Sequence, residues 1–215
     1  MPKLCLVGMM GSGKSTVGLL VANRLGWPFA DSDRIVEAES GRSIAEIFAG
    51  GREPRGGRAG ERGRGGGLGG SGEQAFRELE EAVVARLLGT PGPMVVALGG
   101  GAPTIAATRE RLTAATVAWL RGSPRVLAGR LRGATDRPLL AGGPAPEHAS
   151  QVAPRGESAP EIPEIEETLR RIEECRRPTY EAVADLVVDT EGRSPQEVAE
   201  SVTAAVLGAL PRAPR

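Results

Sequence analysis

The stretch Gly8-Met9-Met10-Gly11-Ser12-Gly13-Lys14-Ser15-Thr16 decides the fold class of this chain. It fits the pattern G-x-x-x-x-G-K-[ST], which forms a phosphate-binding loop, or P-loop, where it joins a strand to a helix. The apolar run at residues 4–7 is typical of a buried parallel strand, and residues 17–25 carry apolar side chains at helical spacing. An ordinary glycine-rich turn is the alternative, but such a turn has no need of Lys14 and Ser15. We therefore predict a P-loop.

The residue types of this loop predict its chemistry. Glycines let the backbone curl so that several N–H groups point at one phosphate, and the start of the following helix adds partial positive charge. The Lys14 ammonium would reach the β- and γ-phosphates, and the Ser15 hydroxyl would ligate one Mg²⁺ ion. The sequence thus predicts binding of a nucleoside triphosphate by consecutive residues, namely Gly11, Ser12, Gly13, Lys14, Ser15 and Thr16.

The composition restricts the partners of the chain. Its 215 residues are enough for one domain, here expected to span 1–215. Because 27 basic residues balance 27 acidic ones and aromatics make up only 3%, nothing favours nucleic acid or a membrane surface. The N-terminus runs directly into a core strand, no apolar run is long enough to cross a membrane, and Cys5 and Cys175 make no disulfide framework. We expect a soluble cytoplasmic protein in which both cysteines are buried or half-buried.

Strand patterns alternate with helix patterns along the whole chain. Such alternation predicts an α/β fold in which helices cover both faces of a parallel sheet. In the helix expected at 73–88, Phe76, Leu79, Val83 and Leu87 share one face. The strands are expected at 4–7, 27–30, 94–98, 116–120 and 185–189, and the other helices at 17–25, 35–39, 43–48, 109–112, 124–132, 164–176 and from Ser194 onward.

Two tracts interrupt this pattern. Residues 51–71 are almost only Gly, Arg, Glu, Pro and Ala, so we interpret them as a flexible basic insertion; binding of phosphate or nucleic acid is the alternative. Residues 138–163 are interpreted as a lid that carries an insertion rich in Gly, Pro, Ala and Glu, with the sole histidine, His148, in solvent. Residues 211–215 are expected to be a disordered tail.

Two further motifs stand where predicted strands end. Asp31 and Asp33 could point to different sides, one towards Mg²⁺ and one towards a hydroxyl substrate, although a helix N-cap would also use such residues. Gly99-Gly100-Gly101 would permit close approach of a small ligand, although a plain turn would use glycines too. Since ligands of open α/β sheets bind at the carboxyl ends of strands, both motifs are candidate site residues.

Three arginines are candidates for binding anions. Arg77 lies near the start of its helix, an unfavourable place for a cation unless an anion pairs with it. Arg137 opens the second irregular tract, where a lid arginine could clamp a phosphate. Arg176 precedes Pro178 at an expected helix end, where a surface role and a functional role are both open.

The combination of these motifs resembles shikimate kinases. The resemblance runs from about Lys3 to Leu207, and the two irregular tracts have no counterpart in it. The motifs occur in the family's order: Gly8 to Ser15, Asp31-x-Asp33, Gly41-Arg42-Ser43-Ile44-Ala45-Glu46-Ile47-Phe48, Gly72-Glu73-Gln74-Ala75-Phe76-Arg77, Gly99-Gly100-Gly101, Arg137-Pro138-Leu139-Leu140 and Arg176-Arg177-Pro178-x-Tyr180.

The resemblance implies a fold and a reaction. The fold would be the three-layer P-loop kinase fold, with a central parallel sheet, a helical substrate-binding region and a mobile lid. The reaction would be the ATP-dependent phosphorylation of the 3-hydroxyl of shikimate, on the route to chorismate and the aromatic amino acids. The protein would be a monomer whose small-molecule partners are shikimate and ATP.

The resemblance also implies roles for residues on the shikimate side. Arg77 and Arg176 would bind the shikimate carboxylate with two guanidinium forks. Asp33 would hydrogen-bond the ring hydroxyls and take or orient the proton of the attacking one. The backbone of Gly99, Gly100 and Gly101 would pack against the ring.

On the ATP side the resemblance implies three more roles. Asp31 would hold Mg²⁺ through water, and Arg137 would neutralise charge on the transferring γ-phosphoryl group. Arg130 would stack on adenine. With Lys14 and Asp33, Arg137 would make up the catalytic set.

Two other functions remain open at this point. Another small-molecule P-loop kinase, such as a gluconate kinase, would share the P-loop but has no reason to keep Arg77 and Arg176. A nucleotide-binding module without activity is the second alternative, but Lys14, Asp33 and Arg137 are all present. The two irregular tracts remove no motif residue, so activity is expected to survive them.

Overall fold

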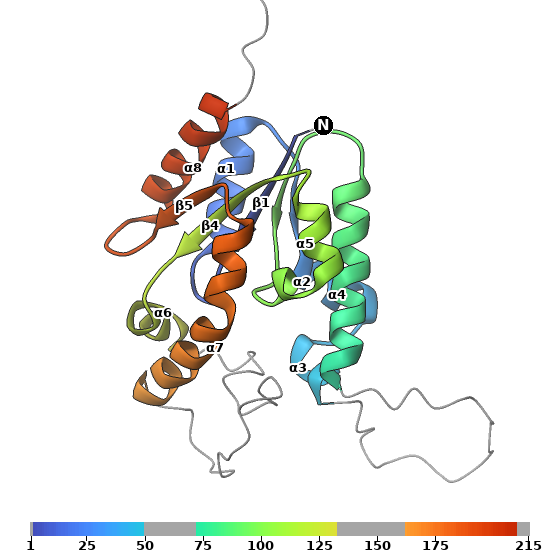
Figure 1. Ribbon diagram of the computed structural model, residues 1–215, viewed down its shortest axis with the longest axis vertical. Coiled ribbons are helices and arrows are strands. Elements are labelled where there is room, and N and C mark those ends of the chain that lie inside the picture. Colours follow the sequence, from blue (N-terminus) through green and yellow to red (C-terminus); the bar gives the residue numbers. More distant parts are fainter. Residues whose placement is uncertain (1, 50–71, 133–161, 210–215) are drawn as a thin grey trace, which may run out of the picture.

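A computed structural model describes residues 2–49, 72–132 and 162–209. In these ranges strands and helices alternate along the chain (Figure 1). The strands are β1 (Lys3–Val7), β2 (Phe29–Asp31), β3 (Met94–Ala97), β4 (Thr116–Arg121) and β5 (Leu186–Asp189). The helices are α1 (Lys14–Leu25), α2 (Ser32–Ser40), α3 (Ile44–Phe48), α4 (Gly72–Gly89), the 3₁₀ helix η1 (Ala102–Thr104), α5 (Ala106–Leu112), α6 (Pro124–Leu131), α7 (Ile162–Val183) and α8 (Pro195–Ala209).

Several expectations lie outside the described residues. They concern the insertion at 51–71, the arginine at 137, the tail at 211–215 and nearly all of the lid at 138–163. The last two positions of that lid, Ile162 and Pro163, are the first residues of α7.

The five strands form one sheet in the order β2-β3-β1-β4-β5, and every neighbouring pair is parallel. This confirms the predicted parallel sheet. The chain first builds β2 and β3 on one side of β1 and then β4 and β5 on the other, so the strand order reverses at β1. In open α/β sheets, ligands bind beyond the carboxyl ends of the strands at such a reversal. The P-loop stretch leaves β1 at this point.

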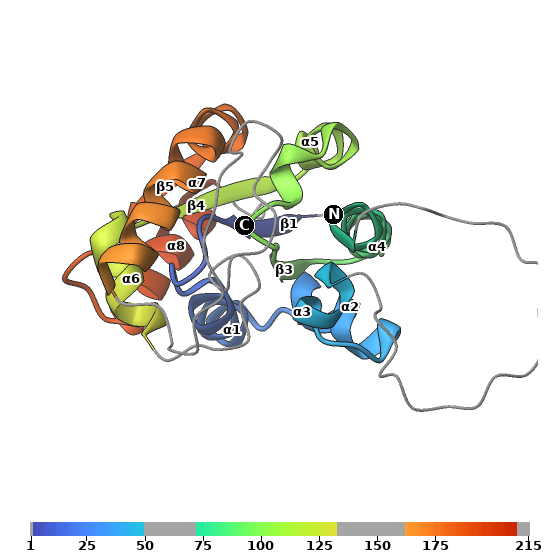
Figure 2. The same ribbon diagram turned by 90° about the horizontal axis from the view of Figure 1, so that it is seen from below.

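Helices cover both faces of the sheet, which confirms the three layers (Figures 1 and 2). Successive strand side chains point to opposite faces. In β1, Leu4 and Leu6 pack in the cluster with α1 and α8, whereas Cys5 and Val7 belong to the cluster with α4, α5 and α7. An uninterrupted apolar run is what a strand buried on both faces requires.

The buried face of α4 differs from the prediction in one position. Phe76, Val83 and Leu87 are buried as expected, but Leu79 is 39% exposed and Glu80 is only 1% exposed. The helical repeat places position 80 between those three side chains and position 79 beside them. The prediction from hydrophobicity was therefore wrong at this turn of the helix. The buried residue is Glu80, whose carboxylate pairs with Arg77, and not Leu79.

Helix α7 continues past the point where we expected it to end. Pro178 lies inside the helix, although it has no N–H to donate to the preceding turn. Packing beyond the proline compensates, because Tyr180 is fully buried and stacks near Trp119, with ring centroids 5.7 Å apart. Arg176 is consequently a mid-helix residue that is 9% exposed, and the expectation of a helix end at this residue was wrong.

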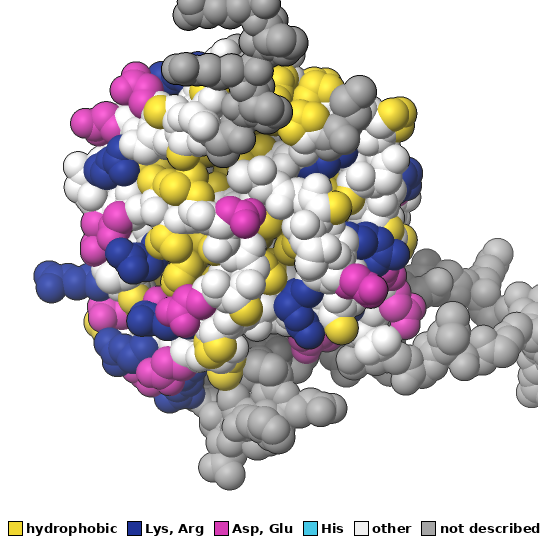
Figure 3. All heavy atoms as spheres, turned by 45° about the horizontal axis from the view of Figure 1, so that its top comes forward, with side chains coloured by type: hydrophobic (Ala, Val, Ile, Leu, Met, Phe, Trp, Pro, Cys, Tyr) yellow, Lys and Arg dark blue, Asp and Glu magenta, His cyan; other side chains and the backbone are white. Residues whose placement is uncertain are grey.

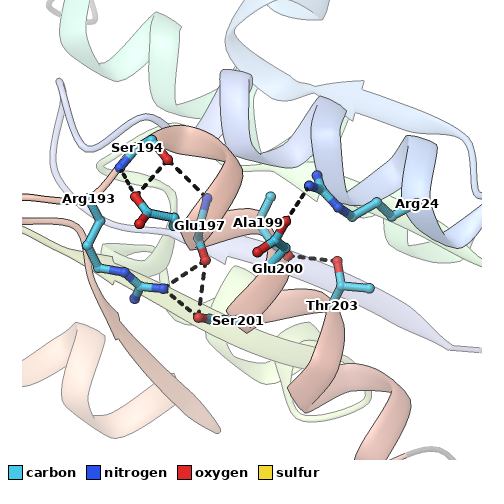
Figure 4. A network of polar contacts seen from close by, with 8 residues as sticks. All are labelled: Arg24, Arg193, Ser194, Glu197, Ala199, Glu200, Ser201 and Thr203. Carbon is cyan, nitrogen blue, oxygen red and sulfur yellow. Dashed lines mark hydrogen bonds and ion pairs between the residues drawn. The ribbon is translucent and has the colours of Figure 1, made fainter.

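The start of α8 confirms the helix expected from Ser194 onward and carries a capping box (Figure 4). The Ser194 N–H donates to Glu197 Oε2 over 2.7 Å, and the Glu197 N–H donates to Ser194 Oγ over 3.3 Å. Two orphan donors of the first turn are thus satisfied reciprocally. Glu200, which also lies on α8, forms an ion pair with Arg24 of α1 at 3.2 Å. The cap stabilises the first turn of α8, and this ion pair joins α8 to α1.

The outer surface carries both signs of charge. On the face drawn in Figure 3, Lys and Arg side chains lie close to Asp and Glu side chains, among scattered apolar patches. None of the helices in 2–49, 72–132 and 162–209 has the length and apolar character needed to span a bilayer.

The two cysteines have opposite environments. Cys5 is fully buried in β1, and burial raises the pKa of its thiol to about 12. Cys175 on α7 is exposed, contrary to our expectation that it would be buried or half-buried. The reason is the helix face: Cys175 lies next to the buried Arg176 but points outward.

Candidate active site

The P-loop backbone has the conformation that its glycines were expected to allow. Gly8, Gly11 and Gly13 have φ values of 141°, 78° and 90°, a region that side chains with a Cβ rarely adopt. At Gly8 a Cβ would also lie 2.5 Å from the Leu120 carbonyl oxygen. The loop therefore turns sharply around its own N–H groups and ends at the first residue of α1, Lys14.

Lys14 folds over the loop. Its Nζ donates to the carbonyl oxygens of Gly8 at 2.9 Å and Met9 at 3.0 Å. The ammonium group therefore lies against the loop backbone, where a bound phosphate would compete for it. A lysine in this position can move onto a phosphate without a change in the backbone.

Ser15 and Asp31 form the second polar contact of this end of the cleft. Ser15 Oγ donates to Asp31 Oδ2 over 2.6 Å. The other carboxylate oxygen of Asp31 accepts from the backbone N–H groups of Asp33 at 3.1 Å and Arg34 at 3.3 Å, so Asp31 is also the N-cap of α2. The N-cap alternative thus holds for Asp31, and it leaves Oδ2 facing the P-loop. Asp33 lies in the first turn of α2 rather than at the strand end itself.

The Ser15–Asp31 pair fits a hard cation. A hydroxyl and a carboxylate oxygen are the donors that Mg²⁺ prefers, and Mg²⁺ keeps several waters and substrate oxygens in its shell. Within the described parts of the chain, no group of three His, Cys, Asp or Glu residues could hold a metal by itself. The donor set suits an ion that the nucleotide brings with it.

The other end of the cleft is built around Arg77 on α4. Its Nη1 donates to Glu80 Oε2 over 2.8 Å, and its Nη2 lies 3.5 Å from Glu73 Oε1. The partial positive charge at a helix start disfavours a cation, and the carboxylates of Glu80 and Glu73 compensate for it at Arg77. Burial raises the pKa of Glu80 to about 7, Arg77 and Arg176 work against this rise, and nearby Asp33 adds to it.

The glycine triplet lets charged side chains approach one backbone segment. A Cβ on Gly99 would lie 2.1 Å from Glu80 Oε1 and 2.5 Å from Asp33 Oδ1. A Cβ on Gly101 would lie 2.1 Å from Arg77 Nη1, and one on Gly100 would lie 3.3 Å from an Arg176 nitrogen. Charged groups from α2, α4 and α7 therefore occupy the space in which side chains at positions 99–101 would lie.

Two hydroxyl groups hold the triplet in place. Tyr180 Oη donates to the Gly100 carbonyl over 2.5 Å, and the Gly99 N–H donates to Ser32 Oγ over 2.9 Å. Burial raises the pKa of Tyr180, and the neighbouring Arg176 guanidinium partly opposes this. Both hydroxyl groups are buried inside the domain, so they fix the backbone against which the arginines lie.

Arg130 connects the P-loop to the segment after β5. Its guanidinium donates to the Thr190 carbonyl at 2.7 Å and to Thr190 Oγ1 at 3.1 Å. It also reaches the Gly11 carbonyl at 3.4 Å. Arg130 thus lies at the outer side of the P-loop.

One cleft of about 520 Å³ joins both ends. Its lining includes residues from the P-loop and α1, from the end of β2, α2, α3 and α4, and from α6 and α7. In Figure 1, α3 and the start of α4 lie opposite α6 and α7. Of the predicted residues, Ser12 and Gly99 lie behind the cleft wall, and position 137 is outside the described residues. Those that line the cleft are Gly11, Gly13, Lys14, Ser15, Thr16, Asp31, Asp33, Arg77, Gly100, Gly101, Arg130 and Arg176.

Sequence reasoning missed several polar residues of this site. Glu80 was detectable, because it stands three residues after Arg77 and at helical spacing from Phe76 and Val83. Tyr180 belongs to a recognised motif but received no role. Ser32, Arg34 and Glu37 had no local signal, because only the fold brings their helix to the cleft. Of these residues, the cleft is lined by Arg34, Glu37 and Glu80.

A parallel α/β sheet with a P-loop at its strand-order reversal, joined by one cleft to a pair of arginines, defines a P-loop kinase acting on a small molecule. The shikimate kinase family model matches residues 10–55 and 68–207. The shikimate kinase of Paramagnetospirillum magneticum is 40% identical over 194 residues, covering 90% of this chain and 78% of that protein. That of Symbiobacterium thermophilum is 36% identical over 202 residues, covering 93% and 92%. The chain belongs to the shikimate kinase family.

Solved structures agree with this assignment. Shikimate kinase from Acinetobacter baumannii, in complex with shikimate, superposes with a TM-score of 0.74 at 30% identity and covers 97% of this chain and 94% of that one. Shikimate kinase from Bacteroides thetaiotaomicron gives a TM-score of 0.70 at 25% identity, with 96% and 98% covered. A gluconokinase from Sinorhizobium meliloti, at 19% identity and a TM-score of 0.55, shares the fold only.

Proposed function

We propose that this chain transfers the γ-phosphoryl group of ATP to the 3-hydroxyl of shikimate, in the pathway to chorismate and the aromatic amino acids. One observation carries the proposal: Arg77 and Arg176 approach the same glycine triplet, in the cleft that also holds the P-loop. Two guanidinium groups at one end suit a carboxylate, and a P-loop at the other suits a triphosphate. Membership of the shikimate kinase family identifies the carboxylate-bearing substrate as shikimate.

ATP binds at the P-loop in this proposal. The N–H groups of residues 11–16 hold the phosphates, and Lys14 leaves the carbonyls of Gly8 and Met9 for the β- and γ-phosphates. Arg130 lies beside adenine, where its contacts with Thr190 and Gly11 keep the guanidinium plane in place. Arg137 neutralises charge on the transferring group; this role rests on the sequence motif, because position 137 lies outside the described residues.

Ser15 and Asp31 would hold Mg²⁺, Asp31 through water. The ion, when bound, neutralises charge on the β- and γ-phosphate oxygens. The 2.6 Å contact between Ser15 Oγ and Asp31 Oδ2 supports this role, since it brings two hard oxygen donors together beside Lys14. The N-cap bonds to the other oxygen of Asp31 keep its carboxylate oriented.

Shikimate binds at the other end of the cleft. Arg77 and Arg176 hold its carboxylate, and the backbone of residues 99–101 packs against the ring. Asp33 hydrogen-bonds the ring hydroxyls and takes or orients the proton of the attacking one. Its position at the start of α2 supports this role, because its Oδ1 is close to Gly99 of the triplet and its side chain lines the cleft that the two arginines and the P-loop share.

The remaining expectations also stand as proposals. The enzyme works as a monomer in the cytoplasm, and it binds neither nucleic acid nor membranes. Two free cysteines, one of them exposed, are compatible with a reducing compartment.

A coupled ADP-release assay with shikimate or gluconate tests the proposed function. We expect turnover with shikimate and ATP, and at most background turnover with gluconate. Equal or greater turnover with gluconate would favour another kinase of this fold. Binding of ATP without turnover of either compound would favour a module without activity.

A further inference from the structure

Glu80 lies inside the cleft, yet phosphoryl transfer as proposed above gives it no role. Its side chain is 1% exposed, and its Oε2 accepts a hydrogen bond from Arg77 over 2.8 Å. Its Oε1 is buried and has no hydrogen-bond partner among the residues that the structure describes. A buried carboxylate oxygen without a donor is costly, whereas a proton on that oxygen removes much of the cost.

The charges that face Glu80 come from three helices. From α4, Arg77 favours the ionised form, although Glu73 competes for the same guanidinium. From α7, Arg176 also favours ionisation, and Tyr180 lies close by. From α2, Asp33 opposes ionisation, and its Oδ1 faces the same point on Gly99 as Glu80 Oε1. Burial outweighs the two arginines and brings the pKa of Glu80 to about 7.

We propose that Glu80 takes up one proton from solvent when the carboxylate of shikimate binds to Arg77 and Arg176. The inference rests on the proposed function, because shikimate is its ligand. A second carboxylate at the same two guanidinium groups adds a negative charge beside Glu80 in a water-poor site, and like charges there disfavour ionisation. Neutral Glu80 still accepts the hydrogen bond of Arg77 through Oε2, so Arg77 keeps its position while its charge serves the substrate.

Glu80 is thus a positioning residue with two states. Without substrate, and above about pH 7, it supplies negative charge that holds Arg77 in the cleft. With substrate it is a neutral acid that still accepts the hydrogen bond of Arg77 Nη1. The charge of the guanidinium is then paired with the shikimate carboxylate. The role differs from that of Glu73, whose more exposed carboxylate lies 3.5 Å from Arg77.

The proposal fixes the direction of the pH dependence. Below pH 7 the free enzyme already carries the proton, so shikimate binding needs no uptake. Above pH 7 the free carboxylate must first be neutralised, and the Kd for shikimate rises by up to about tenfold per pH unit. The Kd for ATP, bound at the other end of the cleft, stays constant over this range.

Isothermal titration calorimetry of the full chain with shikimate tests this directly. Measured at pH 8 in phosphate and in Tris, the binding enthalpies differ by the number of protons taken up times the difference in buffer ionisation enthalpy. We expect about 0.9 protons per shikimate at pH 8 and about 0.1 at pH 6. Glu80→Gln is expected to take up none at either pH and to keep one Kd from pH 6 to 8.5.

Glu81→Gln is the matched control, because Glu81 follows Glu80 on α4 but pairs with Arg111 outside the cleft. It should behave like the wild type. Wild-type binding at pH 8 without proton uptake, or unchanged uptake in Glu80→Gln, would overturn the proposal. The wild-type result is decisive even if Glu80→Gln does not fold. Absence of shikimate binding at both pH values would overturn the proposed function, and this proposal with it.

Discussion

Glycine serves different purposes at the two ends of the cleft. In the P-loop, Gly13 has a φ of 90°, and a Cβ there would meet only Val17 Cγ2, at 3.8 Å, among the described residues. The backbone conformation therefore requires glycine. In the triplet, Gly101 has an ordinary φ of −97°, but a Cβ would lie 2.1 Å from Arg77 Nη1. Here the neighbours require glycine. The nucleotide end of the cleft, at the P-loop, depends on the backbone conformation of consecutive residues. The acceptor end, at the triplet 99–101, depends on side chains from other helices that pack against a backbone without side chains.

The largest expected effect breaks the nucleotide end alone. Lys14→Ala should lower kcat with shikimate by about 10²–10³-fold or more, because a charged group aimed at the transferring phosphoryl is lost. The fold should remain, since the hydrogen bonds of Lys14 Nζ to the carbonyls of Gly8 and Met9 lie on the surface of the loop itself and not in the core. A coupled ADP assay measures the loss and circular dichroism the fold. Arg86→Ala, on the exposed side of α4, is the control, and near-normal turnover of Lys14→Ala would refute the P-loop assignment.

The second prediction breaks the acceptor end alone. Arg77→Lys keeps the charge but loses the planar fork, worth about 1.5–3 kcal/mol for a charged hydrogen bond. The KM for shikimate should rise about 10- to 100-fold, and the KM for ATP should change little. Initial rates over both substrates test this, with Arg86→Lys on the same helix as control. An equal loss for ATP would mean that Arg77 serves structure rather than substrate.

The third prediction tests the two uses of glycine against each other. Gly101→Ala forces Arg77 to move, so the KM for shikimate should rise about tenfold, roughly 1.4 kcal/mol, at constant KM for ATP. Gly13→Ala strains the backbone by about 1–2 kcal/mol and should raise the KM for ATP instead. Steady-state kinetics of both variants are needed. The comparison fails if both substitutions affect the same substrate.

The smallest effect is expected for the tract at 51–71. The ends that it joins already meet, because a Cβ on Gly72 would lie 2.3 Å from the Phe48 carbonyl oxygen. A short turn joining Gly50 to Gly72 should therefore leave the Tm and kcat nearly unchanged. Loss of folding or of shikimate turnover in this deletion variant would show that the tract takes part in the domain.

The sequence predicted the nucleotide end better than the acceptor end, for a physical reason. The P-loop is nine consecutive residues whose local conformation follows from glycine and from the flanking strand and helix. The acceptor end depends on contacts between α2, α4 and α7, which no spacing along the chain reveals. Its place near a helix start made Arg77 a candidate for binding an anion, but the shared role of Arg77 and Arg176 at one carboxylate came from the family resemblance. Their common approach to the triplet needed the structure.

Two errors have the same origin. Leu79 was assigned to the buried face because it is apolar, yet Glu80 occupies that position since Arg77 pairs with it. Pro178 was taken as the end of a helix, yet the packing of Tyr180 carries α7 through it. In both cases a tertiary contact outweighed a sound local rule.

The unequal cysteines provide a means of observing the enzyme at work. Cys5 is inaccessible and its thiol pKa of about 12 keeps it protonated, so alkylating reagents at neutral pH leave it untouched. Cys175 is exposed and directly precedes Arg176 on α7. A maleimide fluorophore can therefore be attached at one defined position without prior mutagenesis, on the helix that carries Arg176, one of the two arginines proposed to bind shikimate. The wild-type chain already contains the attachment point for a fluorescent sensor of shikimate.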